Sequence, residues 1–238
     1  MSVAGYAVLA GTILLASCLQ ASIGFGIGML AAPVVAILDP ALIPGTLIMV
    51  ATLVTLMVAV ADREGIDVTG TGWALVGRVP GTIAGALLLA ALPERGLALM
   101  LAAVVLAGVV LTGAGWMPAA RRRNVVLAGA TSGLLGTATS IGGPPMALVW
   151  QRNSGARLRG TMSGFFLIGS LMSLAALALT GAVDAHTVRM FVILVPASVA
   201  GWILSRYVNR HLDRDRLRWL AITVSALGAA VLVVREAL

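Results

Sequence analysis

Long apolar runs without charge dominate the chain and set its class. Neither Val3–Leu19 nor Gly96–Ala120 contains a charged side chain. One helical span of a bilayer needs about 20 such residues. Hydrophobic residues make up 60% of the chain and charged residues 11%, whereas a soluble domain carries about a quarter charged residues. The pattern therefore predicts an all-α polytopic membrane protein.

The charged residues refine this class. All 16 basic residues are arginine and the formal net charge is +7. They fall mainly between the apolar runs, which is typical of loops at an anionic membrane surface rather than of a nucleic-acid-binding face. Aromatic residues make up 5% and no segment alternates with a period of two, so an outer-membrane barrel is not expected. The N-terminus lacks a positively charged region, so no cleaved signal peptide is expected.

The sequence repeats itself at about half its length. Val79–Gly85 resembles Val195–Gly201 at an offset of 116 residues. Ala21–Phe25 resembles Thr139–Gly143 at an offset of 118 residues, which pairs the serines of the two segments. Chance similarity of apolar sequence would not keep one order and nearly one offset. The pattern predicts two homologous halves within one membrane domain.

The two halves are residues 1–118 and 124–238. Each is expected to contain a broken apolar segment followed by three spanning helices. The expected segments are Val3–Leu19, Ile27–Leu38, Leu42–Ala61, Trp73–Leu92 and Leu97–Gly115, then Val125–Thr137, Met146–Gln151, Thr161–Thr180, Val188–Tyr207 and Leu217–Val234. The stretch after the second break, Ile141–Gln151, would span about 16 Å as a helix, and the hydrocarbon core is about 30 Å thick. We therefore expect a re-entrant hairpin at each break.

The arginines favour the hairpin interpretation. If the second hairpin returns to its own side, the clusters at 121–123 and 152–159 share one face with those at 206–218 and with Arg63. Arg95, Arg189 and Arg235 are then left, with both termini, on the periplasmic face. This asymmetry follows the positive-inside rule. Each half makes an odd number of crossings, so we expect inverted repeats, as in many secondary transporters.

The two broken segments carry the chemistry. Irregular backbone at membrane depth is tolerated where it is buried in protein or lines a cavity. Pro144 suits the first turn of a new helix, and Ser140 or Thr139 can cap that helix. The N-terminus of the new helix favours an anion. The candidate substrate-binding residues at the breaks are Gln20, Ser22, Gly24, Phe25, Gly26, Thr139, Ser140, Gly142, Gly143 and Pro144. The alternative for these glycines is close helix packing, which Gly24-x-x-x-Gly28 and Gly81-x-x-x-Gly85 both fit.

A family resemblance rests on these same motifs. Ser22-Ile-Gly-Phe-Gly-Ile-Gly28 with Pro33 downstream, and its second copy Ser140-Ile-Gly-Gly-Pro-Pro145, resemble the TauE/SafE sulfite exporter family of membrane permeases. The resemblance implies a permease of the bacterial inner membrane for sulfur-containing anions such as sulfite, thiosulfate or organosulfonates. An anion channel and a carrier of small organic carboxylates remain alternatives. Phe25 and Ile27 interrupt the glycine run of the first copy.

The partners expected are a small anion and the lipid bilayer, with a homodimer as one compatible assembly; no nucleic acid, metal or cofactor is expected. No His, Asp or Glu lies within an apolar segment, so Ser22 and Ser140 lack a base and an enzyme is not expected. Arg78 has two interpretations: a snorkelling anchor near the cytoplasmic end of its span, or a charge facing the anion path.

Three further pairs of residues have structural interpretations. His186 and His211 should lie on opposite sides of the membrane, so that they form no pair. Thr46 and Thr161, near the starts of equivalent helices, fit capping or packing as well as function. Trp116 and Trp150 fit anchoring at the membrane interface.

Overall fold

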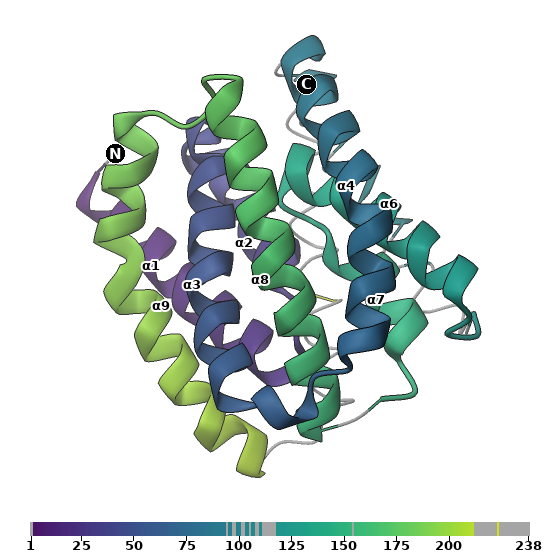
Figure 1. Ribbon diagram of the computed structural model, residues 1–238. Helices are drawn as coiled ribbons and strands as arrows, with labels where there is room; N and C mark the ends of the chain where they lie inside the picture. Colours follow the sequence, from purple (N-terminus) through teal and green to yellow (C-terminus); the bar gives the residue numbers. More distant parts are fainter. Residues whose placement is uncertain are drawn as a thin grey trace.

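The computed structural model describes residues 2–93, 118–153 and 155–211, together with 95, 96, 99, 100, 103, 104, 106, 107, 110 and 223. Every regular element with bounds in these ranges is a helix (Figure 1). The elements are α1 (Val3–Ile23), α2 (Ile27–Leu38), η1 (Pro40–Leu42), α3 (Gly45–Ala61), η2 (Arg63–Gly65), α4 (Val68–Ala91), α6 (Arg122–Thr139), α7 (Gly143–Trp150), α8 (Gly155–Leu179) and α9 (Ala185–His211).

The helices confirm an all-α membrane protein. By length and hydropathy, α1, α4, α8 and α9 are able to cross a bilayer, and α2 and α3 are shorter apolar helices. The expected segment Ile27–Leu38 coincides with α2. The expected last segments of the two halves, Leu97–Gly115 and Leu217–Val234, fall largely outside the described residues.

Helices α4 and α9 are among those that begin earlier than the apolar pattern indicated, and an aspartate explains each of these two starts. Helix α4 begins at Val68 rather than at Trp73, because the Asp67 side chain accepts a hydrogen bond from the N–H of Gly70 at 2.9 Å. Asp184, which precedes α9, accepts one from the N–H of Thr187 at 2.7 Å. A carboxylate at this position satisfies an N–H that the helix itself leaves unpaired.

The aspartate before α9 makes stability depend on pH. Hydrogen bonds from the backbone N–H and the hydroxyl of Thr187 lower the pKa of Asp184. A lowered pKa stabilises the fold above the ordinary value of about 4 and loses that contribution as pH falls through the folded-state pKa. At neutral pH we expect Asp184→Asn, which can still cap the helix but cannot ionise, to melt below wild type. The difference in Tm should shrink in acid; a difference that persists at about pH 2 would contradict this assignment.

The helices of the two halves interleave. Helix α1 packs against α9, α4 packs against α6, and α3 and α8 contact each other between these pairs (Figure 1). In the expected repeat, α1 corresponds to α6 and α4 to α9. Each half thus supplies one helix to each outer pair, and the first helix of one half packs on the fourth helix of the other.

Glycines bring α4 and α6 into backbone contact. A Cβ at Gly77 would meet the carbonyl of Val126, and one at Gly81 would meet the carbonyl of Ala130. From the other side, a Cβ at Gly129 would meet the carbonyl of Ala74. Small residues at such spacing let membrane helices approach closely. The packing interpretation of Gly81 is therefore confirmed.

The two ends of the bundle are held by equivalent contacts. At one end, the Thr46 hydroxyl on α3 donates to the carbonyl of Thr187 on α9 at 3.2 Å. At the other, the Thr161 hydroxyl on α8 accepts from the N–H of Asp67, which precedes α4, at 2.9 Å. Thr46 and Thr161 therefore join helix starts of opposite halves, the structural role that the sequence left open.

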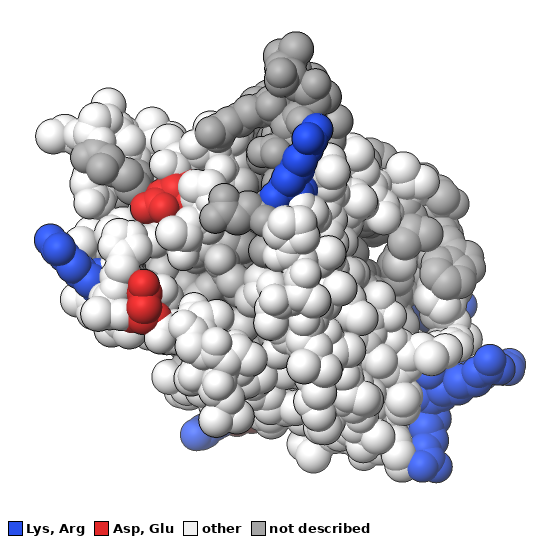
Figure 2. Space-filling view, turned by 90° about the horizontal axis from the view of Figure 1, so that it is seen from above, with Lys and Arg blue, Asp and Glu red and all other residues white. Residues whose placement is uncertain are grey.

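Contacts between a basic and an acidic side chain add one further link at each end. His186 Nε2 lies 3.4 Å from Asp39 Oδ2, and Arg159 Nε lies 2.8 Å from Asp62 Oδ2. His186 and His211 lie at opposite ends of α9, so the expectation that they do not pair is confirmed. Figure 2 views the end that carries the α8–α9 connection; charged side chains stand near its rim and much of the surface between them is uncharged.

Candidate functional site

The chain breaks between α1 and α2 and again between α6 and α7, where the sequence predicted. Gly24 ends α1 in the left-handed region with φ 89°, and Gly26 precedes α2 with φ 145°. Ser140 ends α6 with φ 64°, which is uncommon for a residue with a side chain. Helix α7 begins at Gly143 with proline in its first turn, as expected.

The helix ends change which residues of the two breaks are equivalent in the sequence repeat. Gly24 and Ser140 both occupy the left-handed position after a helix, and they are 116 residues apart in the sequence. That offset agrees with the one from Val79–Gly85, whereas the pairing of Ser22 with Ser140 is two residues out of register. Ser22 lies inside α1, where its hydroxyl donates to the carbonyl of Cys18 at 2.8 Å. The shared Ser-Ile-Gly letters therefore stand at different structural positions.

Neither Ser140 nor Thr139 caps α7. Gly142 precedes that helix and offers no side chain to cap it. The Ser140 hydroxyl donates to the carbonyl of Pro44 at 3.1 Å, and the Thr139 hydroxyl accepts from the N–H of Ile141 at 3.3 Å. In the first break a residue from the preceding helix supplies the acceptor: the N–H of Ile27 donates to Gln20 Oε1 at 3.1 Å.

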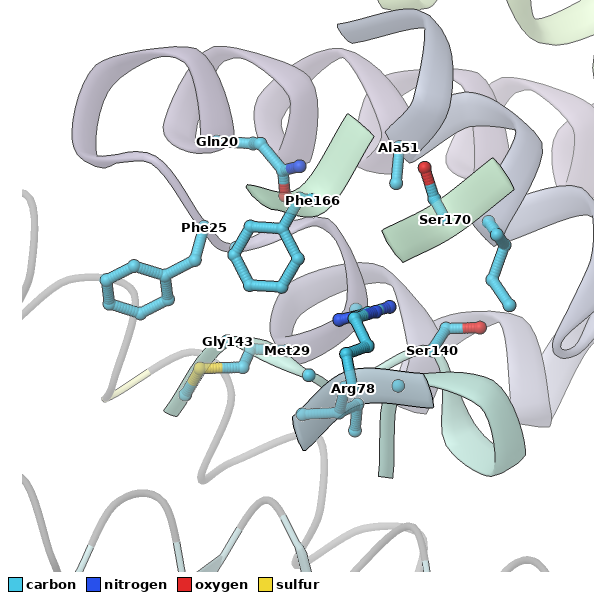
Figure 3. Close-up of a pocket in the computed structure, with 15 residues that line it drawn as sticks. Gln20, Phe25, Met29, Ala51, Arg78, Ser140, Gly143, Phe166 and Ser170 are labelled. Atoms are coloured by element: carbon cyan, nitrogen blue, oxygen red, sulfur yellow. The ribbon is translucent and has the colours of Figure 1, made fainter. Parts of the chain in front are cut away.

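The two breaks touch each other. A Cβ at Gly28 would lie against the carbonyl of Ser140, and one at Gly143 would lie 3.0 Å from the ring of Phe25. The N-termini of α2 and α7 therefore face a common cavity (Figure 3). The cavity is lined by Gln20, Phe25, Gly26, Gly28, Met29, Ile48, Ala51, Arg78, Gly136, Ser140, Ile141, Gly142, Gly143, Phe166 and Ser170.

Most of the predicted site residues come together here. The cavity brings together Gln20, Phe25, Gly26, Arg78, Ser140, Gly142 and Gly143. The lining does not include Ser22, Gly24, Thr139 and Pro144. Pro144 instead borders a separate apolar cavity beside α6. The cavity has a volume of about 40 Å³, and one bound water needs about 10–15 Å³.

Arg78 is the cation of this cavity. Its side chain is 3% exposed, and Figure 3 shows it among the lining residues. Nη1 donates to the Ser132 hydroxyl at 3.1 Å, and Nη2 donates to the Ser173 hydroxyl at 3.4 Å. The guanidinium carbon lies 5.0 Å from the centre of the Phe165 ring, close enough for a cation–π interaction.

The anchor interpretation of Arg78 is wrong. The early start of α4 at Val68 places Arg78 about 15 Å along the helix from that end. An arginine side chain cannot reach the membrane surface over this distance. Its hydrogen bonds to α6 and α8 also turn it inward, into the protein and away from lipid.

No carboxylate compensates this buried charge in the described part of the chain. The acidic residues described there are Asp39, Asp62, Glu64, Asp67 and Asp184, and all lie at helix ends or in the turns between helices. Arg78 is also the only charged side chain that is buried in the described ranges. A guanidinium so placed is costly unless an anion pairs with it.

A comparison with known families agrees with this chemistry. The family model described as sulfite exporter TauE/SafE matches residues 9–232. The chain belongs to the TauE/SafE sulfite exporter family. No curated protein and no solved structure matches it. Membership makes this TauE/SafE protein a membrane transporter from a family that handles sulfur-containing anions.

Sequence reasoning missed the residues that hold Arg78 in this TauE/SafE protein. The Ser132 hydroxyl accepts from Arg78 and donates to the carbonyl of Gly142 at 2.6 Å, so it ties the cation to the second break. Ser173 holds the other terminal nitrogen. Serines among apolar residues give little signal, because a helical serine can also bond its own backbone.

The position of Trp150 also differs from the prediction. It was expected at the membrane interface, but it is 3% exposed. It packs edge-on against Phe165 with ring centres 5.8 Å apart. Phe165 in turn lies beneath the Arg78 guanidinium, so Trp150 belongs to the core that supports the site. Trp116 lies outside the described residues.

Gly169 of α8 makes room for the cation in this TauE/SafE site. A Cβ there would meet Nε and Cζ of Arg78. We expect Gly169→Ala to displace the guanidinium and to weaken anion binding by tenfold or more, about 1.4 kcal/mol. Gly164→Ala on the same helix is the control, because its Cβ meets only Ile66 at ordinary contact distance, 3.4 Å. Equal anion affinity in the two variants, measured on purified protein, would contradict this role.

Proposed function

We propose that this TauE/SafE protein is a secondary carrier that binds one small sulfur oxyanion, such as sulfite or thiosulfate, in the cavity between its two broken helix pairs. One observation carries the proposal. Arg78 stands fully buried in the middle of α4, held by neutral hydroxyls, with no carboxylate beside it in the described residues. A bound oxyanion would supply the missing negative charge. It would also accept hydrogen bonds from the guanidinium N–H groups that are not bonded to the serines.

The helix ends support an anion in the same place. Gly26 and Gly142, the residues that precede α2 and α7, both line the cavity. The first N–H groups of a helix have no acceptor within the helix, and its N-terminus carries about half a positive charge. Two such ends and one guanidinium would create a positive site in an interior with no other buried charge among the described residues. The candidate roles of Gly142 and Gly143 therefore rest on their backbone rather than on any side chain.

The small volume favours a compact substrate. A space for a few water-sized groups suits an anion with one or two sulfurs and a few oxygens better than a longer organosulfonate or dicarboxylate. Phe25, Met29 and Phe166 form apolar walls. Such walls exclude water and so strengthen each charge-assisted hydrogen bond to the anion.

We also infer that the broken pairs α1–α2 and α6–α7 are re-entrant hairpins of inverted repeats in the bacterial inner membrane. Two contacts support this arrangement. Asp39, after α2, pairs with His186 at the start of α9, whereas Arg159, near the start of α8, pairs with Asp62 at the end of α3. The two hairpins would then open to opposite ends of the bundle. Rocking of one half against the other would give alternating access to the anion.

Single-cysteine labelling tests the topology. In a Cys18→Ala background, Arg122→Cys and Arg157→Cys should both react with a membrane-impermeant thiol reagent from the cytoplasmic side. Ala185→Cys at the start of α9 should react only from the periplasmic side. Residues 122 and 157 flank the second hairpin, so labelling of these two positions from opposite sides would contradict re-entry.

Transport by purified protein in liposomes tests the carrier itself. We expect uptake of labelled sulfite to saturate and to be accelerated by unlabelled sulfite inside the vesicles. Such counterflow requires a site that faces one side at a time. Conductance that rises linearly with sulfite concentration, without counterflow, would identify an anion channel instead. Saturable uptake of a small carboxylate that sulfite does not inhibit would identify a carboxylate carrier.

A further inference from the structure

Gln20 is a second nitrogen-bearing side chain that lines the cavity, besides Arg78. It lies near the end of α1, it is 5% exposed, and it lines the cavity with Arg78. Its carbonyl oxygen Oε1 accepts the N–H of Ile27, the first residue of α2, at 3.1 Å. The side chain therefore reaches across the break and ties the two helices of the first broken pair together.

This hydrogen bond sets the direction of the amide. A glutamine carboxamide has one acceptor oxygen and an NH2 group with two donors. Because the N–H of Ile27 requires an acceptor, the oxygen must face the helix and the NH2 group must face away from it. Within the described residues, the hydrogen bond of this side chain is the one from Ile27. Its two donors are left for the cavity.

Gln20 and Arg78 are connected by hydrogen bonds to different broken pairs, although Arg78 itself lies on α4. Gln20 is bonded to the start of α2, and Arg78 is bonded through Ser132 to the Gly142 carbonyl beside the start of α7. Figure 3 shows the two side chains approaching the cavity from different sides. A ligand that touches both therefore connects the first break to the second.

We propose that the Gln20 NH2 group binds the same anion as Arg78, so that the substrate bridges the two broken helix pairs. The inference rests on the proposed function and narrows its substrate class. Both side chains offer only donors, so the ligand presents unprotonated oxygens on two of its faces. An oxyanion meets this requirement and also supplies the negative charge that pairs with the buried Arg78 guanidinium, which a neutral molecule does not. Binding would also hold the two touching breaks together, so that the carrier stays closed around a loaded site.

Two substitutions separate this role from capping of α2. Gln20→Glu has the same shape and keeps an acceptor for Ile27, but it turns an acceptor toward the anion. We expect sulfite affinity to fall about tenfold or more, as for loss of a hydrogen bond to a charged group, while the Tm without ligand stays near wild type. Gln20→Met is neutral and has no donor, so it removes the bond without adding charge. It should also bind sulfite about tenfold more weakly.

The measurement is calorimetric titration of purified protein with sulfite, with the Tm of each ligand-free variant as the control for folding. If Gln20→Glu or folded Gln20→Met binds sulfite as wild type does, Gln20 is only a cap and the inference is overturned. If Gln20→Met does not fold, Gln20→Glu decides. The variant Arg78→Gln distinguishes a failure of this inference from a failure of the proposed function. Normal sulfite binding by Arg78→Gln overturns the proposed function. Lost binding in Arg78→Gln, together with normal binding in the Gln20 variants, overturns only this inference.

Discussion

Arg78→Gln should reduce sulfite affinity by about 100-fold or more, the usual range when one partner of a buried charge pair is removed. Arg78 is the only buried charge in the described residues, and Ser132 and Ser173 already aim its guanidinium. Glutamine can still donate to a hydroxyl, but it offers neither the charge nor the planar fork that grips an oxyanion. Saturable uptake into liposomes and titration calorimetry both measure the loss.

The stability of the same variant separates binding from folding. Without ligand, Arg78 is a buried cation with no carboxylate beside it among the described residues, so its removal should leave the Tm unchanged or raised. Arg78→Lys keeps the charge, loses the two-pronged geometry and should bind sulfite with an intermediate affinity. A large drop in Tm with normal sulfite affinity in the folded fraction would mean that Arg78 is a structural residue.

Gly28→Ala should abolish sulfite binding and lower the stability of the protein. The added Cβ would lie against the carbonyl of Ser140, and Ile141 Cα is only 3.1 Å from the same position. Both neighbours are backbone atoms, which a rotamer change cannot move aside. The two breaks would have to separate, and the N-termini of α2 and α7 would no longer face one cavity. Overpacking of this kind typically costs about 1–3 kcal/mol.

Gly11→Ala in α1 is the matched control. A Cβ at Gly11 meets nothing within 4 Å, and alanine favours a helix over glycine by about 1 kcal/mol. This variant should bind sulfite normally and should be at least as stable as wild type. Sulfite affinity and Tm are measured for both variants at equal membrane abundance. If Gly28→Ala behaves like Gly11→Ala, the contact between the breaks has no role in the site.

The breaks were predictable because glycine and proline act locally. Gly24 and Gly26 adopt positive φ, and a proline stands in the first turn of α7. Both features follow from the type of a single residue, which the sequence gives directly. Helix α2 was bounded correctly for the same reason, since Gly26 and Asp39 flank it. Most of the cavity lining at the breaks followed from these positions.

The position of Arg78 was not predictable from hydropathy. The apolar run in the sequence begins at Trp73, which predicts Arg78 within about a turn and a half of the helix end. Asp67 caps the helix one turn and more before that point, and so moves Arg78 toward the middle. Hydropathy also does not reveal which face of a helix a residue occupies; here the hydroxyls of Ser132 and Ser173, far away in the sequence, turn the side chain inward.

The serine pairing failed for a different reason. Ser22 and Ser140 share the letters Ser-Ile-Gly, yet one lies within a helix and the other lies after the end of its helix. A helix ends where its backbone is capped, and Gly24 and Ser140 take the left-handed conformation that ends α1 and α6. The two serines are therefore two residues out of register in the repeat, and their hydroxyls have different hydrogen-bond partners.

The central claim is that one oxyanion lies between Arg78 and the two breaks. Selenite has the shape and charge of sulfite, and selenium scatters X-rays anomalously. A crystal structure of the wild-type protein with selenite should show one strong anomalous peak in this cavity, with selenite oxygens about 2.7–2.9 Å from the Arg78 terminal nitrogens. A selenium peak bound elsewhere, with this cavity empty or filled only by water, would contradict the account.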